Sequence, residues 1–184
     1  LPMGKPSTEG GKASYEAIQK AVELALKDEV TAITTAPINK QSLHMAGHTF
    51  PGHTELLGHL TDSKNPSLMM EGNSLRVVLV TTHLPLDQVK SQITEEKVLQ
   101  SIRQTNAWLQ KHVTEIPSIA VVGLNPHCSD GGVFGHEETD FIIPAIKKAQ
   151  QEGIQASGPY PADALFQRTA SEKYDAVICM YHDQ

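Results

Sequence analysis

The sequence contains little cysteine, no long apolar run and no cluster of basic residues. Two cysteines in 184 residues are too few for a disulfide framework, so a reduced, cytoplasmic compartment is the default expectation. The longest apolar runs are about the length of a strand, which predicts neither a membrane-spanning helix nor a signal peptide. The net charge of −6 argues against a nucleic-acid surface and against attraction to anionic membranes. The glycines also lack the GxGxxG fingerprint, so a standard Rossmann nucleotide site is not predicted.

The pattern of apolar residues predicts an α/β protein. Segments with a helical spacing of apolar residues alternate with short apolar runs, which is typical of a layered α/β/α sheet. No repeat or linker interrupts them, so residues 1–184 are expected to form a single α/β/α unit. The strand segments at 67–71 and 77–82 are expected to be antiparallel, because the turn between them at Gly72 and Asn73 is short. Helices are expected at about 13–27, 39–47, 53–57, 94–112, 137–153 and 163–166, and further strands at 30–35, 120–124, 154–157 and 176–181.

Three of the expected strands each end in a histidine. The strands at 77–82, 120–124 and 176–181 lead into His83, His127 and His182. In an open α/β sheet, ligands bind beyond the carboxyl ends of the strands, so the three imidazoles are expected to converge there. Three imidazoles suit a divalent metal ion that keeps an open coordination position, as in a catalytic site.

A structural role is the alternative for these histidines. The chain contains nine histidines, and most histidines are exposed to solvent or bonded to backbone carbonyl groups. The spacings between the three residues match no short metal-binding motif. The pattern alone therefore leaves both interpretations open.

His53 and Thr54 lie at the expected start of a helix, after the turn Phe50-Pro51-Gly52. Unpaired backbone N–H groups and the helix dipole favour an anion at such a position. The two side chains are therefore candidates for holding a phosphate or a carboxylate. Alternatively, Thr54 is simply the N-cap of the helix.

Several long motifs identify a family. The chain resembles the PdxA family, the 4-hydroxythreonine-4-phosphate dehydrogenases of pyridoxal phosphate synthesis, over essentially its whole length. The motifs lie in the order found in the family, and they are TAPINK at 35–40, FPGHTE at 50–55, TTHLPL at 81–86, GLNPH at 123–127, GPYPAD at 158–163 and MYHDQ at 180–184.

The resemblance implies a fold like that of the isocitrate and isopropylmalate dehydrogenases, with two α/β/α lobes and an active site completed across a homodimer. It places the metal ligands on His83, His127 and His182, with His182 lent by the partner subunit, and the substrate-binding pair on His53 and Thr54. The metal is a divalent ion such as zinc, magnesium, cobalt or manganese.

The implied reaction is the oxidation of a phosphorylated amino-acid alcohol by NAD or NADP. In it, the metal lowers the pKa of the substrate hydroxyl, hydride passes to the nicotinamide, and decarboxylation follows. The product in the family is 3-amino-2-oxopropyl phosphate.

Two departures from the family bear on this expectation. The residues after His127 are Cys128-Ser129-Asp130, where family members carry small residues and a glutamate; a cysteine near a metal can bind it or become oxidised. The chain also covers about the middle half of a typical member. Segments that precede residue 1, and the substrate-binding Lys, Asn and Arg that follow Gln184 in the family, are absent. We therefore expect the fragment to be inactive alone and assign the function to its parent protein.

Three other functions remain open. A related dehydrogenase that oxidises 4-phospho-threonate or phospho-erythronate keeps the same histidines, and the approach STEGGK at 7–12 weakly resembles that branch. A zinc hydrolase also fits three histidines with an open coordination position. A domain without catalysis, whose histidines are structural, is the third.

Overall fold

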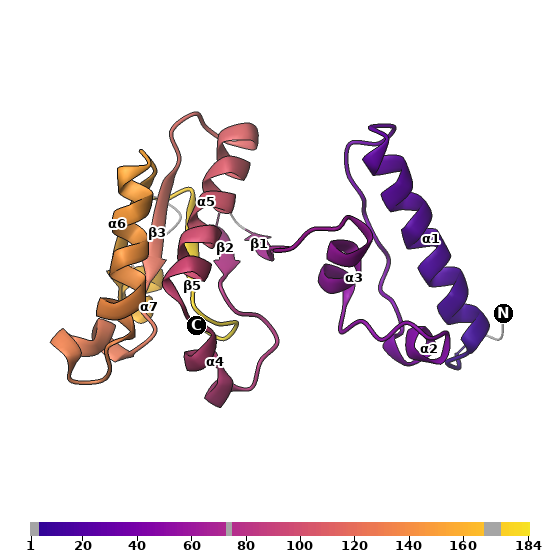
Figure 1. The fold of residues 1–184 in the computed structure, drawn as a ribbon, viewed down its shortest axis with the longest axis horizontal. Coiled ribbons are helices and arrows are strands. Elements are labelled where there is room, and N and C mark those ends of the chain that lie inside the picture. The colour runs from indigo at the N-terminus through magenta and orange to yellow at the C-terminus, as the bar shows by residue number, and fades with distance from the viewer. Residues whose placement is uncertain (1–3, 73–74, 168–173) are drawn as a thin grey trace. The chain divides into compact units, whose positions relative to one another are not determined.

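The computed structural model describes residues 4–72, 75–167 and 174–184. The chain forms two compact units, Leu1–Pro66 and Ser67–Gln184, where the sequence analysis expected one (Figure 1). The helices and strands of the second unit confirm the predicted α/β class.

In the first unit, the described residues 4–66 form three helices packed around a small core. They are α1 (Thr8–Leu26), α2 (Lys40–Met45) and α3 (His53–Leu60). Helix α1 begins five residues earlier than predicted because Ser7 caps it, accepting a hydrogen bond from the Gly10 backbone N–H. Gly11 allows α1 to contact α2, since a Cβ at this position would collide with the Ser42 carbonyl oxygen. The buried apolar side chains of the first unit are Ile18, Val22, Leu43 and Leu56.

The strand predicted at 30–35 is not formed. Within the described residues, this segment has no partner strand and makes no backbone hydrogen bond. Residues Val30, Thr31 and Ala32 are exposed to solvent. A strand is stable only when a neighbour satisfies its backbone groups, and local sequence patterns do not show whether that neighbour is present.

The second unit is built on a five-stranded sheet with the order β1-β2-β5-β3-β4. Strands β1 and β2 are antiparallel, as predicted, whereas β2, β5, β3 and β4 are mutually parallel. Asn73, half of the predicted turn, lies outside the described residues. The strands are β1 (Met69–Gly72), β2 (Leu75–Leu79), β3 (Ser118–Val122), β4 (Gln155–Tyr160) and β5 (Ala176–Cys179).

Helices cover both faces of this sheet. On one face, α5 (Glu95–His112) and α6 (Ile143–Gln151) pack on alternate residues of the central strands, including Ile119, Val121 and Ile178. On the other face, α7 (Ala162–Gln167) packs beside Ala120, Val122 and Cys179. Residues 119–122 and 176–179 are all buried, as expected for strands covered on both sides.

The remaining helical segments of the second unit are short. Helix α4 (Leu86–Gln92) begins three residues after His83, and the sequence analysis did not separate it from α5. A 3₁₀ turn, η1 (Pro126–Gly132), follows β3. A π-helical turn, η2 (Glu138–Ile142), precedes α6, and Pro144 lies in the first turn of α6, where a proline is tolerated.

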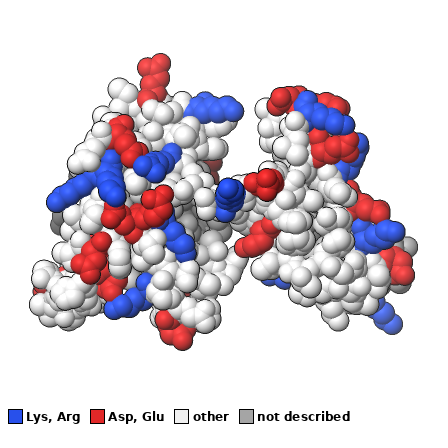
Figure 2. Space-filling view, in the orientation of Figure 1, with Lys and Arg blue, Asp and Glu red and all other residues white. Residues whose placement is uncertain are grey.

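The surface carries charges of both signs. On the face shown in Figure 2, Lys and Arg are interspersed with Asp and Glu on each unit. Among the described residues, no helix is both long enough and apolar enough to cross a membrane.

Candidate functional site

The parallel strands of the second unit deliver the predicted metal ligands to one edge of the sheet. Hydrogen bonding between β2 and β5 continues past the strand ends, where the Thr81 backbone N–H donates to the Met180 carbonyl oxygen over 3.1 Å. The Thr81 hydroxyl donates to the same oxygen over 2.7 Å. The two chain segments therefore stay in register until just before His83 and His182.

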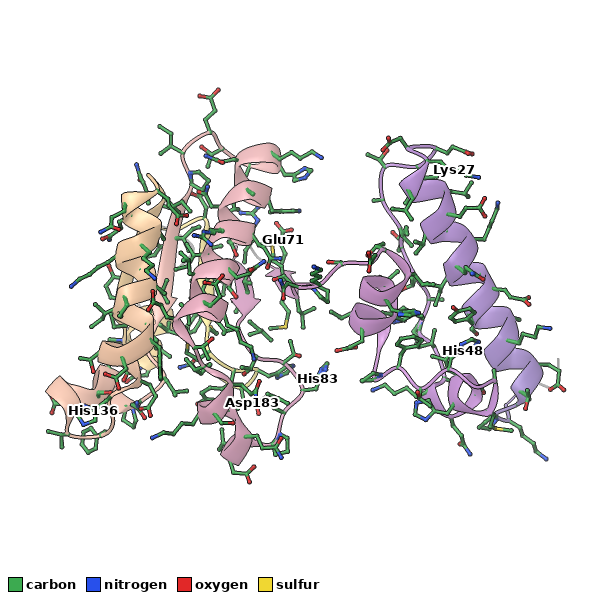
Figure 3. The ribbon with its side chains drawn as sticks, in the orientation of Figure 1. Lys27, His48, Glu71, His83, His136 and Asp183 are labelled. Atoms are coloured by element: carbon green, nitrogen blue, oxygen red, sulfur yellow. The ribbon has the colours of Figure 1, made fainter. Side chains whose placement is uncertain are left out.

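His83 and His182 lie side by side. Their ring centroids are 5.9 Å apart, with an angle of 37° between the ring planes, and both side chains are exposed. His182 Nδ1 lies 2.9 Å from Asp183 Oδ1, a contact that leaves Nε2 available as a ligand. Figure 3 shows His83 and Asp183 at the same end of the second unit.

The third histidine, His127, lies at the same edge but in a different environment. It lines a cavity of about 310 Å³ together with Asn125, Asp163, Tyr181 and Asp183. Its ring contacts Phe134, with 6.5 Å between ring centroids. Gln184 holds the chain after β5 against this cavity, since its side chain accepts a hydrogen bond from Met180 N–H over 2.7 Å and donates one to the Gly123 carbonyl oxygen.

The structure thus brings two of the three histidines together and places the third beside the adjacent cavity. Within one chain, no group of three or more His, Cys, Asp and Glu side chains among the described residues is arranged to hold a metal ion. The separation of His83 and His182 nevertheless suits two ligands of one ion. Metal–nitrogen bonds of about 2.0–2.1 Å put the centroids of two such imidazoles roughly 5–6 Å apart. The three-histidine centre remains a prediction.

His127 begins an unusual stretch of backbone. Five consecutive residues from His127 to Gly131 have positive φ, with values between 44° and 70°. For a residue with a Cβ, the left-handed conformation costs about 1–2 kcal/mol. Four of the five residues carry a Cβ, so interactions elsewhere in the structure must stabilise this turn.

Buried glutamates provide those interactions. Glu138 is only 1% exposed, and its Oε1 accepts hydrogen bonds of 2.7 Å from the backbone N–H groups of Leu124 and Asn125. Its Oε2 accepts from the Asn125 amide over 3.0 Å and from the Ser129 hydroxyl. Burial opposes ionisation, but these donors outweigh it and lower the pKa of Glu138.

Glu137 extends the same network towards the segment after His83. Its carboxylate accepts a 2.7 Å hydrogen bond from the Asn125 amide and pairs with Lys90 of α4 over 2.5 Å. The Lys90 ammonium is the main cause that lowers the pKa of Glu137 from 4.5 to about 2. The sequence analysis interpreted both glutamates only as the start of a helix. Nothing in their local sequence distinguishes them from ordinary first-turn acids, because their partners lie 9 to 14 residues away, from Leu124 to Ser129, and farther away at Lys90 of α4.

The predicted substrate-binding pair lies in the first unit. His53 and Thr54 open α3, and the N-cap is Gly52, which makes no side-chain capping bond. The alternative interpretation of Thr54 as the N-cap is therefore wrong. His53 Nε2 is buried, and it has no hydrogen-bond partner among the described residues. These features suit an anion site, although Glu55 already places one negative charge in the first turn.

The two cysteines occupy different settings. Cys179 is buried in β5, and burial raises the pKa of its thiol to about 12. Cys128 is partly exposed in η1, and burial, followed by the charge of Glu138, raises its pKa as well. Neither thiol is activated as a nucleophile by its protein surroundings.

Comparison with known proteins identifies the relatives. All residues, 1–184, match the family described as "Pyridoxal phosphate biosynthetic protein PdxA". A 4-hydroxythreonine-4-phosphate dehydrogenase of Geobacter metallireducens is 48% identical over the whole chain, which covers 54% of that protein. A D-threonate 4-phosphate dehydrogenase of Cupriavidus necator is 43% identical over the whole chain, covering 56% of that protein.

A solved structure confirms the fold. The crystal structure of 4-hydroxythreonine-4-phosphate dehydrogenase from Klebsiella pneumoniae superposes with a TM-score of 0.93 at 37% identity, covering 100% of this chain and 55% of that one. The chain therefore spans about half the length of the relatives it matches. Because the family match covers all of residues 1–184, the chain belongs to the PdxA family.

Proposed function

We propose that the full-length protein carrying this chain is a metal-dependent dehydrogenase. It oxidises and decarboxylates 4-phosphooxy-threonine (4-hydroxythreonine 4-phosphate) with NAD or NADP, in the biosynthesis of pyridoxal phosphate. Family membership and the names of the relatives support this proposal. The observation that carries it is the pairing of His83 with His182 at the sheet edge, beside the cavity that His127 lines.

The residues have distinct proposed roles. His83, His127 and His182 would hold a divalent metal, and Asp183 orients His182 through its 2.9 Å contact with Nδ1. When bound, such an ion supplies Lewis-acid stabilisation of the substrate oxygen. His53 and Thr54 bind the phosphate through their side chains and the free N–H groups of the first turn of α3.

The active site is proposed to be completed in a homodimer. The expectation that the partner subunit lends His182 stays a prediction, and the approach of His182 to His83 within one chain supports the alternative that one subunit supplies both. We therefore assign these two ligands to the same subunit.

A second substrate is supported by the comparisons. Relatives named D-threonate 4-phosphate dehydrogenase, some of them putatively, are 40–44% identical over the whole chain, and the Geobacter relative is 48% identical. The two substrates share a phosphate and a secondary alcohol and differ in the amino group. The proposed roles of the histidines involve only the phosphate and the secondary alcohol that the substrates share, so these residues do not distinguish the two reactions.

An assay of the full-length protein tests the proposal. The metal is removed with a chelator and restored as zinc, magnesium, cobalt or manganese, and reduction of NAD and NADP is followed with each phosphorylated acid. The proposal predicts metal-dependent reduction with 4-phosphooxy-threonine. Reduction with D-threonate 4-phosphate alone would support the second substrate, and turnover without nicotinamide would contradict both.

A further inference from the structure

The Glu138 carboxylate lies directly behind the turn that carries His127. Its two oxygens accept hydrogen bonds from groups of Leu124 and Asn125, which precede the turn, and from the Ser129 hydroxyl within the turn. The carboxylate is 1% exposed. It is thus a fixed internal anchor, and its contacts all involve the segment from β3 to η1.

Two glycines provide the space for this anchor. A Cβ on Gly123 would lie 2.8 Å from Cys128 Sγ and 3.0 Å from Glu138 Oε1. A Cβ on Gly135 would collide with Glu137 Oε2 and lie 2.8 Å from Asn125 Nδ2. Both sites therefore exclude larger residues because the glutamates and their donors fill the adjoining space.

The anchor also connects two segments that bear predicted ligands. Asn125 Nδ2 donates to both glutamates, and Glu137 pairs with Lys90 of α4, the helix that follows His83. One network therefore reaches from the turn with His127 to the helix after His83. The side chains that make this network are hereafter the acid clasp: Lys90, Asn125, Ser129, Glu137 and Glu138.

We infer that Glu138 is a positioning residue for His127. Its buried carboxylate keeps residues 127–131 in the left-handed conformation, and this conformation directs the His127 imidazole to the sheet edge occupied by His83 and His182. The inference rests on the proposed function for the metal, but the backbone conformation of the turn is independent of it.

The test compares Glu138→Gln with wild type in the full-length protein. The amide keeps the shape of the carboxylate but turns one oxygen acceptor into a donor, which opposes the donors that surround it. The affinity for Co²⁺, measured by titrating its visible absorption, is expected to fall about 10- to 100-fold, as for other residues that orient metal ligands. Crystal structures of both metal-free proteins are expected to show the positive φ values of 127–131 in the wild type and a changed turn in the variant.

Two further variants separate positioning from general stability. Ser129→Ala removes one donor to Glu138 and leaves the carboxylate charged, so a smaller loss of Co²⁺ affinity is expected. Glu152→Gln removes the exposed partner of Arg103 at the end of α6 and is expected to leave the affinity unchanged. If Glu138→Gln does not fold, the Co²⁺ titration and the crystal structure of Ser129→Ala test the inference instead. An unchanged affinity together with an unchanged turn would then overturn it.

The outcomes are distinct. An unchanged Co²⁺ affinity and an unchanged turn in Glu138→Gln overturn the inference, as does a lower melting temperature without either change. Wild-type protein that binds no Co²⁺ overturns the proposed function. In that case the crystal structures still decide whether Glu138 holds the turn.

Discussion

His83 and His182 follow neighbouring parallel strands, and their ring centroids lie 5.9 Å apart within one chain. The register between β2 and β5 produces this proximity, because hydrogen bonds from Val80 and Thr81 to Cys179 and Met180 continue beyond the strand ends. The pair is thus a consequence of the sheet topology within one chain.

Mixed dimers test which subunit supplies these ligands. Suppose that one subunit supplies both His83 and His182 to each site. A dimer of one His83→Ala subunit and one His182→Ala subunit then has no intact site. Equimolar refolding of the two inactive variants is then expected to restore no activity. Recovery of a quarter or more of the wild-type rate would show that the two ligands come from different subunits.

Single histidine variants test the metal centre. His83→Ala and His182→Ala are expected to weaken binding of Zn²⁺ by about 100-fold or more, since each removes a ligand directly. Both residues are exposed, so the melting temperature of the metal-free protein should stay within a few degrees of the wild type. His112→Ala, an exposed histidine at the end of α5, is the matched control. Equal Zn²⁺ affinity in all three variants would contradict the assignment.

Gly123→Ala tests the packing of the acid clasp. The added Cβ would lie within 3.0 Å of Cys128 Sγ and Glu138 Oε1, so a loss of about 1–3 kcal/mol in the free energy of unfolding is expected. Gly72→Ala is the control, because nothing lies within 4 Å of its Cβ position. Urea unfolding measures both. A neutral Gly123→Ala would show that the space behind the turn is not filled as described.

The Glu137–Lys90 pair predicts a specific response to acid. Because folding lowers the pKa of Glu137 from 4.5 to about 2, its stabilisation is complete above about pH 5 and is lost as the pH falls from 4.5 to 2. The contribution is on the order of 2 kcal/mol, allowing for solvent screening of the exposed Lys90. Urea unfolding at several pH values should therefore show Glu137→Gln less stable than wild type at pH 6 and equal to it near pH 2. A difference in stability between Glu137→Gln and wild type that persists at pH 2 would contradict the assigned Glu137–Lys90 ion pair.

Thiol reactivity tests the environments of the two cysteines. A thiol reagent attacks the thiolate, and burial has raised the pKa of Cys179 to about 12. At pH 8, the reagent is expected to leave Cys179 of the native protein unmodified and to react with Cys128 more slowly than with a free thiol. In the unfolded protein, it is expected to react with both cysteines. Mass spectrometry of the labelled peptides distinguishes the two sites. Rapid labelling of native Cys179 would show that β5 is not buried between its neighbours.

The sequence was most informative where structure is set by local patterns. The apolar runs ending at His83, His127 and His182 predicted strands that carry these residues to one edge, and the parallel ladders agree. The short β1–β2 connection predicted their antiparallel pairing, which the structure confirms. The long motifs identified the family, which the spacing of the three histidines alone did not.

Features that depend on distant partners could not be predicted in this way. The segment at 30–35 has the composition of a strand, but pairing depends on a neighbour that its own sequence does not reveal. A single unit was expected, but the chain forms two compact units, Leu1–Pro66 and Ser67–Gln184. The boundary follows from the packing within each unit, and no linker-like composition marks it in the sequence. The acid clasp was missed for the same reason, since Glu138 meets its donors only after β3, η1 and η2 have folded together.

Anomalous X-ray scattering from crystals of the full-length protein, grown with zinc and measured at the zinc absorption edge, tests the central claim most directly. The account predicts one strong peak per active site, within about 2.0–2.3 Å of an imidazole nitrogen of each of His83, His127 and His182. A peak bound by other residues, or no peak at the carboxyl edge of β2, β5 and β3, would contradict it.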